Sequence, residues 1–134
     1  MFTYIMLGTN DLPRSTRFYD AVMATLGHRR CDTTEEPGWE NLAGWGTYEN
    51  GGLKELALWV CAPFNGEPAT AGNGTMAAFA ASTRGQVNSF YEASMENGGT
   101  SEGAPGIREH YAPDFYVAYV RDPDGNKLAA VCRG

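Results

Sequence analysis

The sequence has few residues that can cross-link the chain or bind a metal. It contains 3 cysteines and 2 histidines in 134 residues. Cys31, Cys61 and Cys132 are far apart and odd in number, which fits reduced thiols better than a disulfide framework. No cysteine has a histidine at the spacing of a CxxC-type zinc site, so the sequence excludes a site of that kind.

The sequence also lacks a long apolar run and an excess of positive charge. No apolar run approaches the roughly 20 residues of a membrane span. The first residues lack the basic and apolar stretches of a secretory signal, so we expect a cytoplasmic protein. Lys and Arg number 10 against 16 Asp and Glu, giving a net charge of −6 with no basic stripe. Nucleic acid is therefore not an expected partner.

What the sequence does contain is enough apolar material for one globular domain, at 43% hydrophobic and 19% charged residues. An internal repeat runs through it. Residues 18–23 and 90–95 share Phe, Tyr, an acid, Ala and Met, followed by a glycine, and every matched pair is 72 positions apart. Both segments have the apolar spacing of amphipathic helices. Asp11 can cap the first helix and Thr83 or Ser82 the second, and Gly27 ends the first.

Short strand-like segments surround each helix. We expect strands at 2–7, 28–33, 41–48 and 53–61, and again at 74–79, 100–103, 113–121 and 127–132. The segment 122–126, Asp-Pro-Asp-Gly-Asn, has the chemistry of a hairpin turn. The single domain 1–134 is thus predicted to comprise two βαβββ modules, 1–61 and 74–134, joined by a connector at 62–73. Modules this small should pack together or swap across a dimer.

These features resemble the vicinal oxygen chelate superfamily of glyoxalases, bleomycin-resistance proteins and dioxygenases. The resemblance rests on the βαβββ repeat, the Phe-Tyr pair of each helix and residues 120–126, Val-Arg-Asp-Pro-Asp-Gly-Asn. The stretches 58–75 and 103–108 are similar to small bacterial glyoxalase-like members. The resemblance implies an α+β fold whose modules form a U-shaped, mixed-sheet cleft. It does not imply one reaction, because the family includes isomerases, transferases, dioxygenases and simple binders.

In that family a divalent cation binds in the cleft through imidazole, amide and carboxylate ligands. The resemblance places these ligand positions on Tyr4, Met76 and Ala129, and the fourth within 57–60, where no acid occurs. Phenol, thioether and methyl groups cannot replace imidazole and carboxylate for such a cation. We therefore expect no bound metal, and the sequence indicates no other cofactor.

We predict that the cleft instead binds a small amphipathic or aromatic molecule, because aromatic and polar groups elsewhere in the sequence could line the same cleft. Trp45 and Tyr48 could close its mouth. Strand alternation puts Tyr116 and Tyr119 on opposite faces; Tyr116 is the first candidate and Tyr119 the alternative. The predicted ligand-binding residues are Tyr4, Trp59, Met76, Arg108, Tyr111 and Ala129.

Three functions remain open at this point. The first is a metal-free binding protein of the bleomycin-resistance kind. The second is an enzyme of the lyase, isomerase or dioxygenase type working without metal, with His110 or Tyr116 transferring a proton. The third is a metalloenzyme with relocated ligands, His110 with Glu109 or Asp114. In each case the expected partners are a small molecule and a second copy in a homodimer, with no membrane association.

Overall fold

The computed structural model describes residues 1–134, the whole chain. Two helices and seven strands alternate in the order of the predicted repeat, with a short 3-10 turn, η1, inside the first half. The elements are β1 (Tyr4–Gly8), α1 (Leu12–Ala24), β2 (Leu42–Glu49), η1 (Asn50–Gly52), β3 (Lys54–Cys61), β4 (Met76–Ala80), α2 (Arg84–Glu96), β5 (Thr100–Ile107), β6 (Phe115–Arg121) and β7 (Lys127–Arg133).

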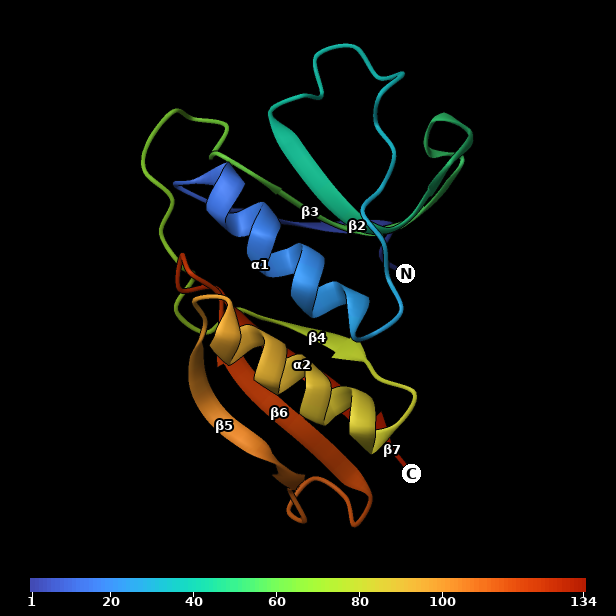
Figure 1. Cartoon of the computed structure of the whole chain (residues 1–134), viewed down its shortest axis with the longest axis vertical. Helices are drawn as coiled ribbons and strands as arrows, with labels where there is room; N and C mark the ends of the chain where they lie inside the picture. The colour runs from blue at the N-terminus through green and yellow to red at the C-terminus, as the bar shows by residue number, and fades with distance from the viewer.

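The strands form two sheets (Figure 1). The first has the order β1-β3-β2, with β1 parallel and β2 antiparallel to β3. The second has the order β4-β7-β6-β5, with β4 parallel to β7 and the other pairs antiparallel. Helices α1 and α2 lie side by side and contact each other, and each packs on the sheet of its own half. The predicted α+β fold of two repeated modules is confirmed.

The strand predicted at 28–33 does not form. Its only pairing is a single bridge between Arg30 and Trp45, supported by a 2.7 Å hydrogen bond from the Cys31 N–H to the Gly44 carbonyl. The side chains of residues 28–30 are exposed, so no apolar face anchors this segment to the core. The first sheet therefore has three strands. In the second module the matching strand, β5, is longer than predicted and reaches Ile107.

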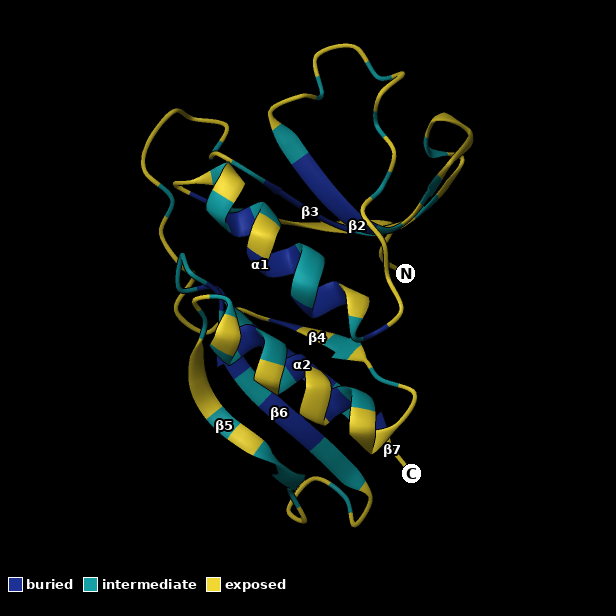
Figure 2. Cartoon of the chain, viewed as in Figure 1, coloured by how far each residue is buried: buried dark blue, intermediate teal, exposed yellow.

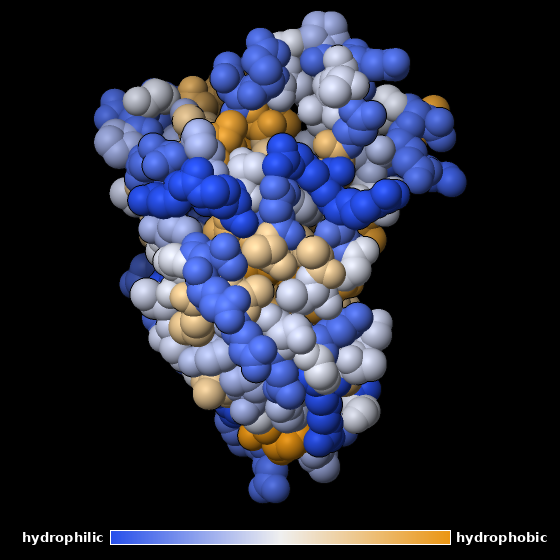
Figure 3. Space-filling model, in the orientation of Figure 1, coloured by the Kyte–Doolittle hydropathy of each residue, from blue (hydrophilic) through white to orange (hydrophobic).

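Both helices begin where the sequence predicts. The Asp11 side chain accepts a 3.0 Å hydrogen bond from the Arg14 N–H, and Thr83 accepts one of 3.1 Å from the Gln86 N–H. Gly27 follows α1 with φ of 86°, a conformation that glycine adopts without strain. The inner stripe of each helix joins one core with the sheets (Figure 2). Figure 3 shows that the helix-bearing face of the molecule is mainly hydrophilic, and neither helix could span a membrane.

The turn between β6 and β7 is buried and centres on Asp122, which is 3% exposed. Its carboxylate accepts hydrogen bonds from the Tyr19 hydroxyl (2.5 Å), the Asn126 amide (2.9 Å) and the N–H groups of Asp124 and Asn126 (2.9 Å each). Burial raises the pKa of Tyr19 well above its ordinary value, and the charge of Asp122 adds to the effect. The phenol therefore remains a hydrogen-bond donor.

The same turn reaches the start of the first module. Asp124 accepts hydrogen bonds from the Thr9 hydroxyl (2.5 Å) and the Asn10 N–H (2.9 Å), and it pairs with Arg14 at 2.9 Å. The Asn126 amide donates to the carbonyl of Gly8 at 3.0 Å. These contacts join residues more than 100 positions apart, so the turn fixes the second module against the β1–α1 corner of the first.

Candidate functional site

Each sheet has one face covered by a helix and one open face. In the second sheet Leu128, Ala130 and Cys132 belong to the core beneath α2. By strand alternation Lys127, Ala129, Val131 and Arg133 lie on the open face, as do Phe115, Val117 and Tyr119 of β6. In the first sheet the core side holds Leu58 and Val60, so Ala57 and Trp59 lie on the open face. A ligand site built on the sheets must use these open faces.

Of the positions that the resemblance assigns to metal ligands, Tyr4, Met76 and Ala129 fall on the open faces. Tyr4 is the register partner of Ala57 in the first sheet, while Ala129 pairs with Ala78, two residues from Met76, in the second. A phenol, a thioether and a methyl group, with no acid within residues 57–60, do not form a ligand set for a hard or borderline cation. Nowhere does the chain bring together three or more His, Cys, Asp or Glu side chains that could hold a metal ion. The residues present therefore do not fit the metal site of the family.

A single chain does not bring Tyr4, Met76 and Ala129 into one pocket. Tyr4 lines a cavity of about 350 Å³ at the facing edges of β1 and β4, together with Phe2, Ile5 and Leu56. Met76 lines a separate hollow of about 510 Å³ on the second sheet. Ala129 is fully buried and lines neither. The shared hollow expected for these three side chains is absent within one copy of the chain.

The open face of the first sheet carries a packed aromatic cluster of Trp39, Tyr48 and Trp59. Their ring centroids are 5.4 to 5.6 Å apart, and Trp59 meets both partners edge to face. Trp59 is 3% exposed, and its indole N–H donates to Glu55 at 2.8 Å. The Tyr48 hydroxyl donates to Glu36 at 3.0 Å. Trp39 comes from the loop before β2 and was not singled out by the sequence.

Trp45 does not close a cleft mouth. It is 1% exposed and packs in the core against Tyr19, with ring centroids 5.2 Å apart. Its indole N–H donates to Asp20 at 2.9 Å. Partial desolvation acts against ionisation of Asp20, but hydrogen bonds from Arg30 and Trp45 outweigh it and lower the pKa of this carboxyl. Trp45 therefore links α1 to β2.

The open face of the second sheet carries aromatic and cationic side chains. The Arg108 guanidinium lies 5.6 Å and the Lys127 ammonium 5.4 Å from the centre of the Tyr119 ring. Arg133 lies 4.7 Å from the centre of Phe115. Sequence analysis named Arg108 but missed the other two cations and Phe115. The alternation of Lys127 and Arg133 with Ala129 along one strand was the signal that could have found them.

The two residues predicted to transfer protons do not share a site. Tyr116 lies on the helix-covered face, where its hydroxyl donates to Asn88 of α2 at 2.7 Å and Arg84 lies over its ring. Tyr119, the alternative, lies on the open face instead. His110 is exposed in the loop between β5 and β6 and stacks on Tyr111, with ring centroids 4.2 Å apart. His110, Glu109 and Asp114 belong to no group of three or more His, Cys, Asp or Glu side chains that could hold a metal ion.

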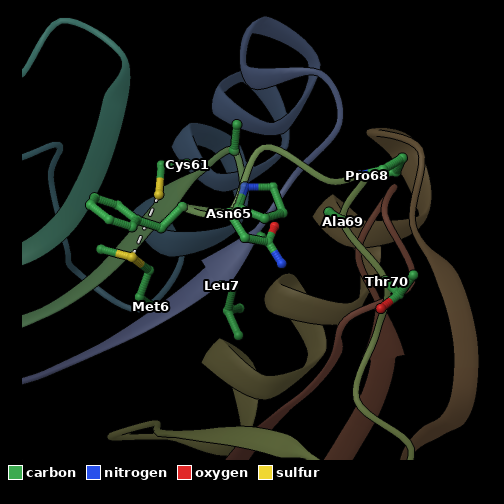
Figure 4. Close-up of a pocket in the computed structure, with 11 residues that line it drawn as sticks. Met6, Leu7, Cys61, Asn65, Pro68, Ala69 and Thr70 are labelled. Atoms are coloured by element: carbon green, nitrogen blue, oxygen red, sulfur yellow. Dashed lines mark hydrogen bonds between the residues drawn. The ribbon is translucent and has the colours of Figure 1, made fainter.

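A third hollow, of about 290 Å³, lies beside the connector between the modules (Figure 4). The sulfur atoms of Met6 and Cys61 meet there at 3.5 Å, and Asn65, Ala69 and Thr70 of the connector complete the wall. Burial raises the pKa of the Cys61 thiol, so it is a poor nucleophile near neutral pH. This hollow contains no charged side chain and no pair of groups suited to catalysis.

Comparison with known proteins agrees with this architecture. The family model of the Glyoxalase/Bleomycin resistance protein/Dioxygenase superfamily matches residues 2–130. A solved glyoxalase/bleomycin resistance protein from Albidiferax ferrireducens T118 is 38% identical, with a TM-score of 0.83, over 100% of this chain and 99% of that one. No curated protein matches the chain.

Two more distant structures share the fold alone. A glyoxalase/bleomycin resistance protein/dioxygenase family enzyme from Burkholderia phytofirmans PsJN is 17% identical, with a TM-score of 0.69, over 98% of each chain. A glyoxalase I mutant from Zea mays is 22% identical, with a TM-score of 0.61, over 97% of this chain and 45% of that one. With the family model covering nearly the whole sequence, this chain belongs to the Glyoxalase/Bleomycin resistance protein/Dioxygenase superfamily.

Proposed function

We propose that this protein binds a small organic molecule with an aromatic or apolar body on the open faces of its sheets, without a metal ion. The observation that carries the proposal is the chemistry of the ligand positions that the resemblance implies, Tyr4, Met76 and Ala129. All three lie on the open faces, and together they cannot coordinate a divalent cation. Apolar walls with a few polar groups are what small-molecule sites require.

We further propose that a second copy of the chain completes the cleft. The strands β1 and β4 are free edges of their sheets, and large apolar side chains on or beside them are exposed. Phe2 is 62%, Tyr4 51%, Met6 50% and Met76 43% exposed, and Leu56 of β3 is 66% exposed. Exposed apolar groups concentrated along unpaired edges favour association. Because one chain keeps Tyr4 and Met76 in separate hollows, a dimer is also the simplest way to bring such side chains together.

The metal-free state is tested by elemental analysis of the purified protein. We expect well below one equivalent of nickel, zinc, iron or manganese per chain, and an unfolding temperature that a chelator does not change. A near-stoichiometric metal that is lost with chelator together with stability would contradict the proposal. The dimer is tested by analytical ultracentrifugation, where Met6→Lys should dissociate it while Leu53→Lys on the exposed turn should not.

Binding is tested by tryptophan fluorescence and thermal shift with neutral and charged naphthyl compounds. We expect at least one of them to bind, with weaker binding by Tyr4→Ala, since this change removes an aromatic wall of the cavity at β1. Leu53→Ala, at an exposed turn residue, is the matched control. No binding by any of the compounds would contradict the proposed function.

No observation favours either enzymatic alternative. A proton-transfer role needs His110 or a tyrosine placed together with other groups around a substrate. The structure instead places His110 in an exposed loop and Tyr116 against α2. We therefore assign the protein a binding role and assign catalysis to none of its residues.

A further inference from the structure

The chain is acidic overall, with a net charge of −6, yet one open face carries three cations. They are Arg108, Lys127 and Arg133, which surround Tyr119 and Phe115 on the second sheet. The four ion pairs of the chain all involve other cations, so none of these three forms an ion pair. Glu102, the acid on β5, is paired with Arg121, and Lys127 also lowers its pKa as a smaller contribution. This face is therefore locally positive.

Two glycines of β5 leave room for the Arg108 side chain. A Cβ atom at Gly103 would lie 3.0 Å from Arg108 Nη2 and 3.1 Å from Tyr119 Cδ2, and one at Gly106 would lie 3.2 Å from Arg108 Nη1. The guanidinium thus lies close against both glycines, and a Cβ at either position would make it shift by a few tenths of an ångström. Its Nη2 also donates to the carbonyl of Ala104 at 2.8 Å. A cation held in this way loses little conformational entropy when a ligand binds.

The centre of the Tyr119 ring lies 5.6 Å from the Arg108 cation and 5.4 Å from the Lys127 cation, and the ring offers an aromatic surface beside them. Burial raises its pKa, with Tyr111 adding to the effect and Arg108 opposing it, so the phenol is neutral at physiological pH. Its hydroxyl forms no hydrogen bond within the chain and can donate to a ligand. Next to it lies the hollow of about 510 Å³, lined by Met76, Ala78, Phe115, Val131 and Arg133 among others.

From this arrangement we infer that the ligand of the second module's open face is an organic anion, an aromatic carboxylate. Its carboxylate binds Arg108 and Lys127, and its ring packs against Tyr119 and the apolar hollow. Guanidinium groups recognise carboxylates through charge-assisted hydrogen bonds, and a planar body gains contact area from ring faces. The inference rests on the proposed function, to which it adds the charge and the chemical class of the ligand.

The test compares three probes that share one ring system: naphthoate, naphthamide and naphthylmethylammonium. Their affinities are measured with the full-length protein by tryptophan fluorescence and calorimetry. Naphthoate should bind about tenfold more tightly than the amide, the difference expected for one charge-assisted contact, and the ammonium should bind most weakly. Added salt should weaken naphthoate binding more than amide binding, because screening acts on the charged ligand alone.

Substitutions then locate the site. Arg108→Gln and Lys127→Gln should each lower naphthoate affinity by about tenfold and leave naphthamide binding within about twofold. Arg17→Gln, on the exposed side of α1, removes the same charge elsewhere and should change neither. Far-UV circular dichroism of each variant should match the parent protein.

The outcomes separate the two proposals. If the amide or the ammonium binds as well as the carboxylate, or if Arg17→Gln weakens naphthoate as much as Arg108→Gln, the anionic ligand is wrong while the binding function stands. If none of the three probes binds the parent protein, the proposed function fails and the anion site fails with it.

Discussion

Tyr19 and Tyr91 occupy equivalent places in the two modules, 72 positions apart, but their surroundings differ. Tyr19 is fully buried and donates to Asp122 in the turn of the other module. Tyr91 is only partly buried, and the residue equivalent to Asp122 is Asn50, which is exposed with φ of 57°. Both modules thus keep the aromatic residue on the inner side of their helix. The tyrosine–aspartate hydrogen bond between the modules, however, exists only for Tyr19 of the first module.

The open faces differ as well. The first module's face holds an aromatic cluster whose neighbouring charges are Glu36 and Glu55. The second module's face holds Tyr119 with two cations near its ring. Repeats that share a backbone plan can therefore present surfaces of opposite charge, because open-face positions are not constrained by the core. A ligand that spans both faces would meet acidic groups on one side and basic groups on the other.

The largest effect is expected from Asp122→Ala, which removes the centre of the buried turn. It leaves the Tyr19 hydroxyl, the Asn126 amide and two backbone N–H groups without their acceptor. We expect the free energy of unfolding to fall by about 3–5 kcal/mol, measured by urea denaturation. The matched change in the first module, Asn50→Gly, should stay within about 0.5 kcal/mol because that turn is exposed and already has positive φ. Equal effects at the two turns would refute the asymmetry.

The next effect is expected from Tyr19→Phe, which should cost about 1–2 kcal/mol by removing one donor to a buried carboxylate. Tyr91→Phe is the control and should be nearly neutral. The two variants should also differ at high pH. The unfolded phenol ionises near pH 10, roughly its model value, whereas burial and Asp122 raise the pKa of Tyr19 in the folded state. The stability that the neutral Tyr19 phenol contributes is thus complete below that pH and is lost as the pH rises further.

Urea unfolding measured from neutral pH to above the ordinary tyrosine pKa tests this sign. The parent protein and Tyr91→Phe should lose stability steeply on the alkaline side, and Tyr19→Phe should lose it less steeply. An unchanged alkaline slope in Tyr19→Phe would show that the buried phenol does not control it.

A smaller effect is expected from Gly103→Ala on β5. The new Cβ would crowd Arg108 Nη2 and Tyr119 Cδ2, at 3.0 and 3.1 Å, so the side chains must shift. We expect about 1 kcal/mol of destabilisation, by thermal or urea unfolding, with weaker naphthoate binding. Gly85→Ala in α2 is the control, because only the Thr83 hydroxyl lies within 4 Å of its Cβ. That change should stabilise the protein by roughly 0.5–1 kcal/mol. Stabilisation at both glycines would argue against a fixed Arg108.

Most of the fold could be predicted because its signals are local. The helix caps at Asp11 and Thr83 depend only on residues close in the sequence. The 72-residue repeat is found by comparing residue identities at a constant offset. The strand at 28–33 formed only a single bridge, because strand formation depends on what covers the segment, and the exposed side chains of residues 28–30 give it no apolar face on the core. Residues 104–107 joined β5 because β6 provides a partner, an interaction that the segment's own sequence does not reveal.

The site was harder to predict for a similar reason. Alternation separated Tyr116 from Tyr119, but only the packing of α2 determines which face is open. Trp45 was expected at the mouth of a cleft, yet it packs against Tyr19 and Asp20 of α1 and lines the cavity beside Tyr4 from within the core. The ligand positions Tyr4, Met76 and Ala129 came from the resemblance to the family, and the 72-residue offset independently paired Tyr4 with Met76. That assignment stays a prediction. Whether two open faces meet depends on a second copy of the chain. The spacing of residues within one chain does not predict how two copies pack.

The smallest effect is expected at an ion pair of the first module's turn, Lys54 with Glu49 at 3.6 Å. Both side chains are more than half exposed, at 69% and 58%. Water screens such a pair, so Lys54→Met should change the free energy of unfolding by no more than about 0.5 kcal/mol, and added salt should not alter the difference.

Arg14→Met provides the comparison. Arg14 of α1 pairs with Asp124 in the turn of the second module, and the Asp124 side chain is 2% exposed. Removing Arg14 leaves a buried carboxylate with only the Thr9 and Asn10 donors, and it should cost about 1 kcal/mol. If Lys54→Met lowered the free energy of unfolding as much as Arg14→Met, exposure would not be what distinguishes the two turns. The exposed turn of the first module would then stabilise the protein through interactions that its contacts do not show.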